Sequence, residues 1–353
     1  MKRLQCAVLI SVGWLCHAQP SALDLTFNPG TGATEEGIVA IVRSIFVESN
    51  GQIIVGGDFQ TFNGQSFNRI ARLNADGSID TNFFVGQGPQ AFVYAVAAQT
   101  NGMLLVGGSF NLINGVTQPN LARLRIDGSL DITFTPNIQE NITSILQQPD
   151  GNILIVGSIT QVNGDALTGI ARLTFNGALD TSFSPALTSG QVSAMALDAT
   201  GNILVAGEIT IGTNQLSAAR LAPNGSQDTT FSLGSIDGAV NQIGIETNGE
   251  IIITGNFTEI NGYSRVGIAE LFSDGQVDPN FRPNPSTSYG TLLAIEQDGR
   301  ILTSGYGMTR VNTDGSVDTT FTPAISSVNC VVIQPDGRIL VGGGFSTVNG
   351  NQP

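Results

Sequence analysis

The chain repeats one short pattern seven times. Each copy combines an apolar strand, an Asx-Gly turn, a second apolar segment that ends in glycine, and an Asp-x-x-Phe motif. A unit this short cannot bury its own apolar face, so stacked copies must share their cores. The Asp and Phe positions recur about every 50 residues and are Asp24/Phe27, Asp80/Phe83, Asp131/Phe134, Asp180/Phe183, Asp228/Phe231, Asp278/Phe281 and Asp318/Phe321.

The second unit shows which strands one repeat contains. Val93–Ala98, Met103–Gly108 and Leu121–Leu124 are mostly apolar, and Asn101-Gly102 is a strong hairpin signal between the first two. Ser129–Phe134 can form a short fourth strand or cross to the next unit. The pattern predicts an all-β fold, a β-propeller of about seven blades with three or four antiparallel strands each. A parallel β-helix is the alternative, but its coils are usually shorter and lack a hairpin in every repeat.

The phrase from Ile70 to Phe83, which contains Ile-Ala-Arg-Leu-Asn-Ala-Asp-Gly-Ser and ends in Asp-x-x-Phe, resembles the delta-60 repeat. This is a bacterial β-propeller repeat that is common in secreted proteins. The resemblance covers nearly all of the chain from Leu23 to Pro353. It implies a propeller on an exported protein, often beside other modules, and it supplies no catalytic residue.

The first 18 residues have the pattern of a signal peptide. Lys2-Arg3 precedes the apolar run Leu4–Cys16, and the small residues Cys16 and Ala18 favour cleavage after Ala18. We expect residues 19–353 to form a single propeller domain, secreted to the periplasm or cell surface of a bacterium. An uncleaved membrane anchor is the alternative, although the apolar run is short for a membrane span.

The two ends of the sequence carry parts of one blade. The last unit stops at Pro353, just before the place where the second unit has its third strand, and Leu23–Phe27 has the pattern of a closing phrase. We therefore predict that the N-terminal segment closes the ring and that the last blade is incomplete. A missing strand would leave exposed sheet edges, which proteins normally avoid. This suggests a fragment of a longer protein.

Composition excludes several kinds of chemistry. The only His (His17) and the only Lys (Lys2) lie in the predicted signal peptide, which removes Ser-His-Asp, Cys-His and Schiff-base catalysis from the mature chain. Cys330 would be the one remaining thiol, and its apolar surroundings predict a buried, inert group. The net charge of −14 opposes binding to nucleic acid and anionic membranes. We expect a monomer that does not insert into a membrane.

Carboxylates are the main side chains left that could serve catalysis. The acids outside the repeat pattern are Asp58, Glu208, Glu259 and Glu270. A pair of them could serve a glycan hydrolase or lyase, but no spacing in the sequence brings two of them together. We therefore predict no catalytic residue, no cofactor and no metal site.

The Asx-Gly turns raise calcium as an alternative. Asn74-x-Asp76-Gly77 resembles part of a calcium loop. The residue two positions before the turn Asx varies, however, and is Arg125, Ala222 or Phe272 in other units. A ligand position would not accept those side chains. Hairpin turns therefore explain these residues better.

An arginine precedes the repeated aspartate by eight residues in five units. The pairs are Arg72/Asp80, Arg123/Asp131, Arg172/Asp180, Arg220/Asp228 and Arg310/Asp318. Because the two residues flank a hairpin turn, we predict an Arg–carboxylate contact. Glu270 takes the place of the arginine before Asp278, so that aspartate needs other donors. The repeated Phe is expected to pack between blades.

Function is expected where the repeat fails, because loops on a rigid scaffold carry binding. The aromatic and basic residues outside the pattern are Tyr94, Tyr263, Arg265, Tyr289 and Tyr306. If exposed, they would suit recognition of carbohydrate or of a surface protein. The sequence thus predicts a non-enzymatic binding, display or scaffold propeller. The alternatives are the carboxylate-based hydrolase or lyase and a purely structural spacer in a larger envelope protein.

Overall fold

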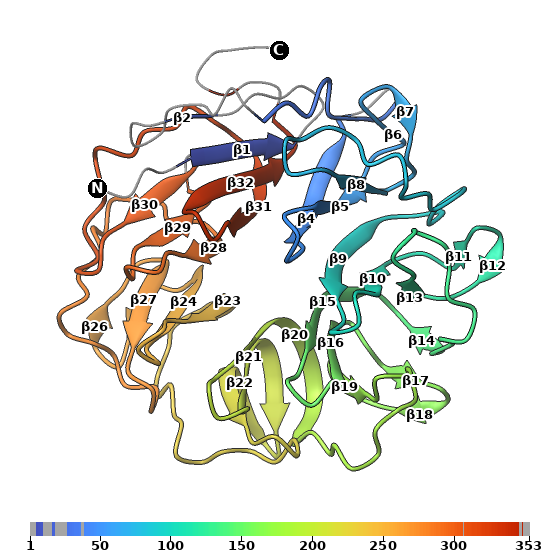
Figure 1. The fold of residues 1–353 in the computed structure, drawn as a ribbon. Helices are drawn as coiled ribbons and strands as arrows, with labels where there is room; N and C mark the ends of the chain where they lie inside the picture. Colours follow the sequence, from blue (N-terminus) through green and yellow to red (C-terminus); the bar gives the residue numbers. More distant parts are fainter. Residues whose placement is uncertain are drawn as a thin grey trace.

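A ring of seven sheets makes up the protein (Figure 1). The computed structural model describes residues 5–9, 16–17, 27–36, 39–305, 307–345 and 348, with only the backbone described for residues 5–9 and 16–17. Within these residues all regular structure is β, which confirms the predicted fold class. No helix in the described part is long and apolar enough to cross a membrane.

Each of the first six blades has three main antiparallel strands, with the middle strand of the sheet second in sequence. From the ring axis outward they are β4 (Ile41–Val47), β5 (Ile53–Asp58) and β8 (Ile70–Leu73); β9 (Val93–Ala98), β10 (Leu104–Gly108) and β13 (Leu121–Leu124); β15 (Ile142–Gln147), β16 (Ile153–Gly157) and β19 (Ile170–Leu173); β20 (Leu187–Leu197), β21 (Ile203–Ile211) and β22 (Asn214–Leu221); β23 (Ala239–Ile245), β24 (Ile251–Asn256) and β27 (Ile268–Leu271); β28 (Leu292–Ile295), β29 (Ile301–Thr303) and β30 (Thr309–Val311). The strands predicted for the second unit are confirmed.

Blade 7 has β31 (Val328–Ile333) and β32 (Arg338–Gly343) in the same antiparallel arrangement. The third place in this sheet is taken by β1 (Gln5–Leu9), which runs parallel to β32 and pairs in turn with β2 (Cys16–His17). In the other blades the third strand is antiparallel to the middle one. The seventh sheet therefore differs in composition from the other six.

Short ribbons lie on the outer rim of several blades (Figure 1). Most of them follow the middle strand of a blade, in the stretch that contains the repeated Asn-Gly turn, while β3 and β14 come before the innermost strand and pair with the hairpin. They are β3 (Ala33–Thr34), β6 (Thr61–Phe62) and β7 (Gln65–Ser66); β11 (Leu112–Ile113) and β12 (Val116–Thr117); β14 (Ile138–Gln139), β17 (Gln161–Val162) and β18 (Asp165–Ala166); β25 (Glu259–Ile260) and β26 (Tyr263–Ser264). The repeat thus makes a main sheet and a second, smaller hairpin outside it.

The inner strands close the ring. Each one contacts the inner strand of the next blade, in the order β4, β9, β15, β20, β23, β28 and β31, and β31 contacts β4 again. Phe27 lies in the core of blade 1, and the backbone N–H of Asn28 donates to Asp76 O at 2.7 Å. Phe84 N makes the same bond to Asp127 O one blade later. The N-terminal segment therefore occupies the predicted closing position against blade 1.

Seven apolar clusters fill the spaces between neighbouring blades. Each cluster contains one phenylalanine of the Asp-x-x-Phe motif, which confirms that these rings pack between blades. They are Phe27, Phe83, Phe134, Phe183, Phe231, Phe281 and Phe321. The cluster of Phe27 also contains Leu340 from blade 7. The core is thus divided among the interfaces between blades.

The repeated phenylalanines are not buried to the same depth. Phe134 and Phe281 are fully buried, whereas Phe183 and Phe321 keep 5% and 4% of their surface exposed. Phe183 also lines a cavity of about 370 Å³ at blade 3. Phe183 is nevertheless buried in the apolar cluster between blades 3 and 4, so the predicted packing between blades holds for it as well.

At two positions in a blade, another backbone segment lies so close that only glycine fits. At the end of β5, a Cβ on Gly57 would lie 2.2 Å from the carbonyl oxygen of Ile41, at a bulge in β4. In the outer hairpin turn, Gly128 has a φ of +89°, and a Cβ there would lie 2.8 Å from Phe84 N of the preceding blade. The Asx-Gly turn therefore serves both the hairpin and the docking of one blade on the next.

The predicted fourth strand is reduced to a single bridge. Leu130 pairs with Leu124 across the outer turn, and the chain then crosses toward the next blade at Phe134. Five further bridges repeat this arrangement: Leu73–Ile79, Leu173–Leu179, Leu221–Gln227, Leu271–Val277 and Val311–Val317. Ser129–Phe134 therefore provides both the short strand pairing and the crossing to the next blade.

Candidate functional site

One arginine makes several contacts at the outer hairpin of the second blade. Arg123 donates from Nε to Asp131 Oδ2 at 2.8 Å, and its Nη2 lies 2.7 Å from the same oxygen. Its Nη1 donates to Phe175 O of blade 3 at 2.8 Å, and its Cζ lies 4.5 Å from the centre of the Phe134 ring. Both charged groups are buried. We call this arrangement the arginine node.

The arginine node recurs, as the eight-residue spacing predicted. The other Nε-to-Oδ2 bonds are Arg72–Asp80 at 2.8 Å, Arg172–Asp180 at 2.7 Å, Arg220–Asp228 at 2.7 Å and Arg310–Asp318 at 2.9 Å. In blades 1 to 4 the arginine also donates to a carbonyl in the outer turn of the next blade, namely Ile126, Phe175, Pro223 and Ser273. The node therefore joins neighbouring blades as well as the two sides of a hairpin.

The repeated phenylalanine belongs to the arginine node, which the sequence analysis did not predict. It assigned the arginine to the aspartate alone and the ring to apolar packing alone. The Cζ atom of Arg172 lies 4.9 Å from the centre of the Phe183 ring, and that of Arg310 lies 4.6 Å from the Phe321 ring. The matching distances are 4.7 Å for Arg72–Phe83 and 5.4 Å for Arg220–Phe231. At this range the guanidinium and the ring face attract each other, so Phe183 and Phe321 serve both the core and the node.

The backbone places the aspartate without help from the arginine. The N–H of Asp131 donates to Arg123 O at 2.9 Å across the hairpin, and the carboxylate accepts from the N–H and the hydroxyl of Thr133. Burial acts to raise the pKa of Asp131, but these bonds and the guanidinium outweigh it and lower the pKa. The repeated aspartate is thus held ionised beside its arginine.

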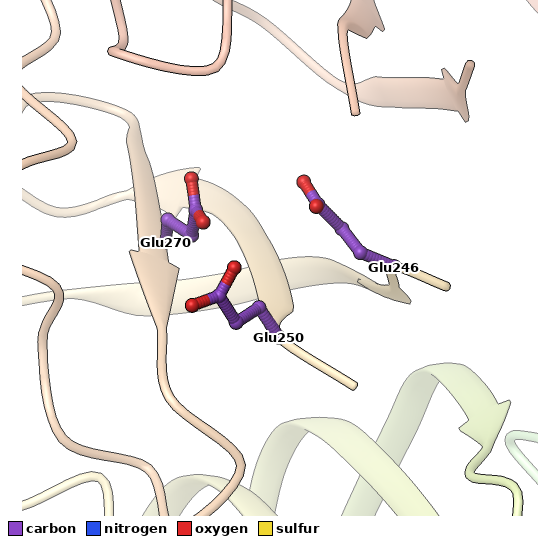
Figure 2. Close-up of side chains that lie close together, drawn as sticks. All are labelled: Glu246, Glu250 and Glu270. Atoms are coloured by element: carbon purple, nitrogen blue, oxygen red, sulfur yellow. The ribbon is translucent and has the colours of Figure 1, made fainter. Parts of the chain in front are cut away.

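Blade 5 has three glutamates at this place (Figure 2). Glu270 lies on β27 at the arginine position, Glu246 follows β23, and Glu250 precedes β24. One carboxylate oxygen from each lies within 4.8 Å of the other two. Glu270 is 5% exposed, while Glu246 and Glu250 are half-buried. We call these three residues the glutamate node.

In blades 1 and 6, the acid at the position of Glu246 faces an arginine. Glu296 of blade 6 lies 2.9 Å from Arg300 Nη2 and 3.6 Å from Arg310 Nη1. Glu48 of blade 1 lies 3.9 Å from Arg72 Nη1. The glutamate node keeps the acids and replaces the central cation with another acid.

The electrostatic effect on Glu270 is large. Burial is the main cause that raises its pKa to about 8, and the neighbouring carboxyls of Glu250, Glu246 and Asp278 raise it further. Burial and the charge of Glu250 also raise the pKa of Glu246, although Asn248 opposes them with a hydrogen bond. Near neutral pH, a carboxylate triad without a cation therefore keeps a proton on Glu270.

Arg265 partly compensates for the missing arginine beside Asp278. Its Nη2 donates to the Asp278 carbonyl at 2.9 Å, and Asn280 N donates to the Asp278 carboxylate at 2.8 Å. Arg265 is 6% exposed, and burial lowers its pKa while Asp278 opposes this effect. Its Cζ lies 5.3 Å from the ring centre of Tyr263, which is 42% exposed on the rim hairpin. Arg265 therefore supports an exposed aromatic ring from beneath.

A second aromatic group lies between blades 1 and 2. The guanidinium of Arg43 lies 5.4 Å from the ring centre of Tyr94 and 5.9 Å from that of Phe92. Tyr94 is half-buried and Phe92 is 37% exposed. Arg43 also lies 3.8 Å from the buried carboxylate of Asp58. The structure does not bring this group together with Tyr263 in one blade.

Tyr289 does not meet the condition of exposure that was set for a ligand-binding aromatic residue. Its side chain is 1% exposed and packs with Phe281 in the apolar cluster between blades 5 and 6. Its hydroxyl accepts a hydrogen bond from Asn284 N at 2.7 Å. The strands of blade 6 are short, and the ring supplies volume that longer strands supply elsewhere. Tyr306 lies outside the described residues.

A polar cavity lies beside the segment that contains Tyr289, which is also part of its lining. It has a volume of about 500 Å³ and lies between the end of β24 and the segment 285–291. Its lining includes Asn241, Asn256 and Thr258, and also Val266, which follows Arg265 in the chain. The cavity and the exposed Tyr263 thus belong to the same part of blade 5.

The acids of the hydrolase alternative lie apart in the fold. Asp58 is on β5, Glu208 on β21, Glu259 on β25 and Glu270 on β27. Glu270 meets Glu246 and Glu250 and not the other three candidates. Sequence reasoning noted Glu270 as an exception but missed its two partners. An alignment of the units would have placed Glu246, Glu48 and Glu296 in one column facing the arginine.

Two smaller expectations concern turns and the thiol. Asp76 accepts hydrogen bonds from the N–H and the hydroxyl of Ser78, so its carboxylate is engaged within the turn. Cys330 packs against the core between blades 7 and 1, and its Sγ lies 3.8 Å from Val42 O. Burial raises the pKa of this thiol to about 12. Cys330 is therefore a thiol and not a reactive thiolate at neutral pH.

Solved structures similar to this chain include extracellular domains of bacterial proteins and a WD40 β-propeller domain. The extracellular domain of the putative one component system BT4673 from B. thetaiotaomicron has 14% identity and a TM-score of 0.59, with 92% of this chain and 39% of that chain covered. YCF48 bound to D1 peptide has 13% identity and a TM-score of 0.56, with 95% and 100% covered. The WD40 β-propeller domain of Doa1 has 18% identity and a TM-score of 0.54, with 94% of each chain covered. At these identities the likeness shows the fold.

A search of curated proteins gave no match. One family model matches seven segments of the chain, in register with the blades, at residues 48–83, 99–134, 148–183, 199–231, 246–281, 296–321 and 334–352. This confirms a β-propeller family made of tandem repeats, while the delta-60 name is not part of the description. The chain belongs to the family described as domain of unknown function (DUF5122) β-propeller.

Proposed function

We propose that this protein is an extracellular, non-enzymatic binding propeller of the delta-60 type, and that it recognises carbohydrate. The proposal includes a cleaved signal peptide over residues 1–18 and a monomeric domain over residues 19–353 on a bacterial surface or in the periplasm. Support for the location comes from similar extracellular domains of bacterial proteins. A surface protein is the alternative ligand.

The observation that carries the proposal is the concentration of non-repeated residues on blade 5. Tyr263 is held exposed on the rim hairpin by the buried Arg265, which hydrogen-bonds to the backbone at both ends of its guanidinium. The neighbouring cavity is lined by Asn241, Asn256 and Thr258. An aromatic face beside preformed polar groups is suited to a sugar ring.

The burial of Glu270 weighs against a hydrolase. A paired-carboxylate enzyme needs both groups to reach a glycosidic bond. Glu270 is 5% exposed and lines none of the three cavities of about 370 to 500 Å³ found at blades 3, 4 and 5. This supports binding over hydrolysis at Glu270.

A thermal melt of the full chain against a panel of soluble oligosaccharides tests the proposal. A ligand that binds only the native state raises the melting temperature by mass action. We expect at least one glycan to raise it, and Tyr263→Ala to abolish that shift. Phe92→Ala is the matched control, because Phe92 is also an exposed aromatic beside an arginine. No shift with any glycan, or a shift that Tyr263→Ala leaves intact, contradicts carbohydrate recognition at this site.

A further inference from the structure

We propose that one extended, uncharged polysaccharide binds across the rim of blades 3, 4 and 5, with the carbohydrate site of blade 5 as its anchor. The inference rests on the proposed function and deepens it, because it adds two subsites and names the class of polymer. It starts from three cavities on consecutive blades, which we call the rim track. Their lining residues come from the segments 165–187, 208–236 and 241–291.

The three cavities occupy equivalent places in the repeat. Each lies between the outer strand of its blade and the segment that crosses to the next blade. The lining residue at one matching position before the apolar part of the outer strand is Thr168, Leu216 or Val266. The volumes are about 370, 420 and 500 Å³ for blades 3, 4 and 5, within the range of small-molecule sites. The propeller thus presents one kind of cavity on three successive blades.

The cavities of blades 4 and 5 are direct neighbours. Ile236 lines the cavity of blade 4, and Thr258 lines the cavity of blade 5. Asp237, the residue after Ile236, accepts a hydrogen bond from Thr258 N at 2.8 Å and a second one from the Thr258 hydroxyl. Ile236 also pairs with Ile260 of the rim hairpin of blade 5. A ligand that leaves one cavity therefore reaches the other after passing a single residue.

The cavities of blades 3 and 4 are joined by one pair of strands. Leu187 of β20 lines the cavity of blade 3, and Glu208 of β21 lines the cavity of blade 4. In this strand pair Leu187 is the partner of Ile211, and Gln191 is the partner of Glu208. The β20–β21 ladder therefore supplies one wall of each cavity, and the rim track continues from blade 3 to blade 5.

The polar side chains of the rim track select against acidic ligands. Among the described residues, no arginine or lysine lines any of the three cavities. Instead, Asp165 lines the first and Glu208 the second, while Asn241 and Asn256 line the third. Carboxylates and amides accept hydrogen bonds from sugar hydroxyls, whereas uronate or sulfate groups would be repelled. The net charge of −14 adds to this repulsion, so the polymer is uncharged.

Tyr263 makes blade 5 the anchor of the rim track. Phe183, Phe231 and Phe257 line the cavities of blades 3, 4 and 5, but each is at most 5% exposed. Buried rings supply an apolar base and no open face on which a sugar can stack. Tyr263 is 42% exposed, and only blade 5 combines such a ring with a cavity of the rim track. We therefore expect a short glycan to bind at blade 5 alone.

The subsites of blades 3 and 4 act on longer chains. Once one part of a polysaccharide is bound at blade 5, its next units lie near the other two cavities at an effective concentration of about 1 mM or more. Contacts that are too weak to hold a free sugar then strengthen the binding of the whole chain. Affinity should therefore rise with chain length until the glycan spans all three blades.

The test is calorimetric titration of the full chain with disaccharides and octasaccharides of neutral glucan, mannan and xylan. We expect the octasaccharide of the preferred glycan to bind at least about tenfold more tightly than its disaccharide. Asp165→Arg and Glu208→Arg place a long side chain at the cavities of blades 3 and 4, at residues that are exposed. Each should weaken octasaccharide binding by about three- to tenfold and leave disaccharide binding unchanged, which also shows that the variant is folded.

Glu36→Arg is the control, because Glu36 is an exposed acid of blade 1 that lines none of the three cavities. It should bind both glycans like the unchanged chain. An octasaccharide of polygalacturonate should bind more weakly than the neutral ones, and tighter binding overturns the assignment of an uncharged polymer.

Failure of this inference differs from failure of the proposed function. Equal affinities for the disaccharide and the octasaccharide, or octasaccharide binding that both variants retain, overturn the rim track and leave the site at Tyr263 intact. Octasaccharide binding that depends on Asp165 and Glu208 but survives Tyr263→Ala contradicts the proposed site and supports the subsites of blades 3 and 4. Absence of binding by every glycan contradicts both.

Discussion

Blades 2 and 5 share one backbone arrangement and have opposite charges at its centre. Asp131 N donates to Arg123 O at 2.9 Å, and Asp278 N donates to Glu270 O at the same distance. Phe134 and Phe281 are both fully buried at the following interface. The hairpin and the packed ring therefore hold the blade in shape whichever side chain occupies the arginine position. The fold therefore does not require an arginine at that position.

Removal of the arginine from blade 2 should have the largest effect. In Arg123→Ala, the carboxylate of Asp131, which is 3% exposed, loses its cation and Phe175 O loses its donor. Loss of one partner of a buried ion pair costs about 3–5 kcal/mol of the free energy of unfolding. Urea unfolding of the full chain measures it. A loss below about 1 kcal/mol would mean that the backbone alone stabilises the node.

The pH dependence of stability should be opposite in sign at the two nodes. In the unfolded chain Glu270 releases its proton near pH 4.5, whereas the folded chain keeps it until about pH 8. The stability from this group is therefore full below pH 4.5 and is lost as the pH rises to 8. Because half-buried neighbours are screened by solvent, we expect a loss of about 2–3 kcal/mol.

Urea unfolding in chelator at pH 5 and pH 8 measures this loss, and Glu270→Gln should remove most of it. Asp131 behaves in the opposite way. The pKa of Asp131 is lowered in the folded chain. Its contribution to the free energy of unfolding is therefore full above the pKa that it has in the unfolded chain, and is lost only in more acidic solution. If the free energy of unfolding of Glu270→Gln depends on pH between 5 and 8 as strongly as that of the unchanged chain, other groups cause the loss.

The shared backbone can be tested at its glycines. A Cβ on Gly128 would lie 2.8 Å from Phe84 N, and one on Gly315 would lie 2.6 Å from Arg282 N. Gly115 also has a positive φ, of +74°, but nothing lies within 4 Å of its Cβ position. We expect Gly128→Ala and Gly315→Ala to cost about 1–2 kcal/mol more than Gly115→Ala. Equal losses for all three variants, measured by urea unfolding, would contradict tight docking.

The smallest effect should come from a second arginine beside the arginine node of blade 2. The side chain of Arg125 is 44% exposed, and its Nη2 lies 3.3 Å from Asp131 Oδ1. Exposed ion pairs contribute about 0–1 kcal/mol, so Arg125→Ala should change the unfolding free energy by less than about 1 kcal/mol. A loss comparable to that of Arg123→Ala would mean that the two arginines act as one unit.

The fold and the arginine node could be predicted because their determinants are local and repeated. Arg123 and Asp131 flank one hairpin, so their spacing of eight residues alone brings them together. The glutamate node could not be derived in the same way, since Glu246 and Glu250 flank the turn between β23 and β24 whereas Glu270 lies on β27, and Glu270 meets them only when the sheet forms. Only the exception at Glu270 was visible in the sequence.

Tyr289 shows a different limit of the sequence. It departs from the repeat as Tyr263 does, but Tyr263 lies on a rim hairpin and Tyr289 fills an interface between blades. Departure from a repeat indicates that a residue has a particular environment. It does not distinguish a gap in the core from an exposed surface, because both select large aromatic side chains.

The position of Phe27 and Leu340 in one core has a consequence for folding order. Cys330 and Val42 are in contact although 288 positions separate them in the sequence. Every other blade joins a neighbour that follows it directly, whereas this junction must first close a loop of nearly the whole chain, and the entropy of closure grows with loop length. We expect this junction to form last, and amide hydrogens beside it to exchange with solvent before those of blades 2 to 5. The least stable junction between blades would then be the one between the first and last blades.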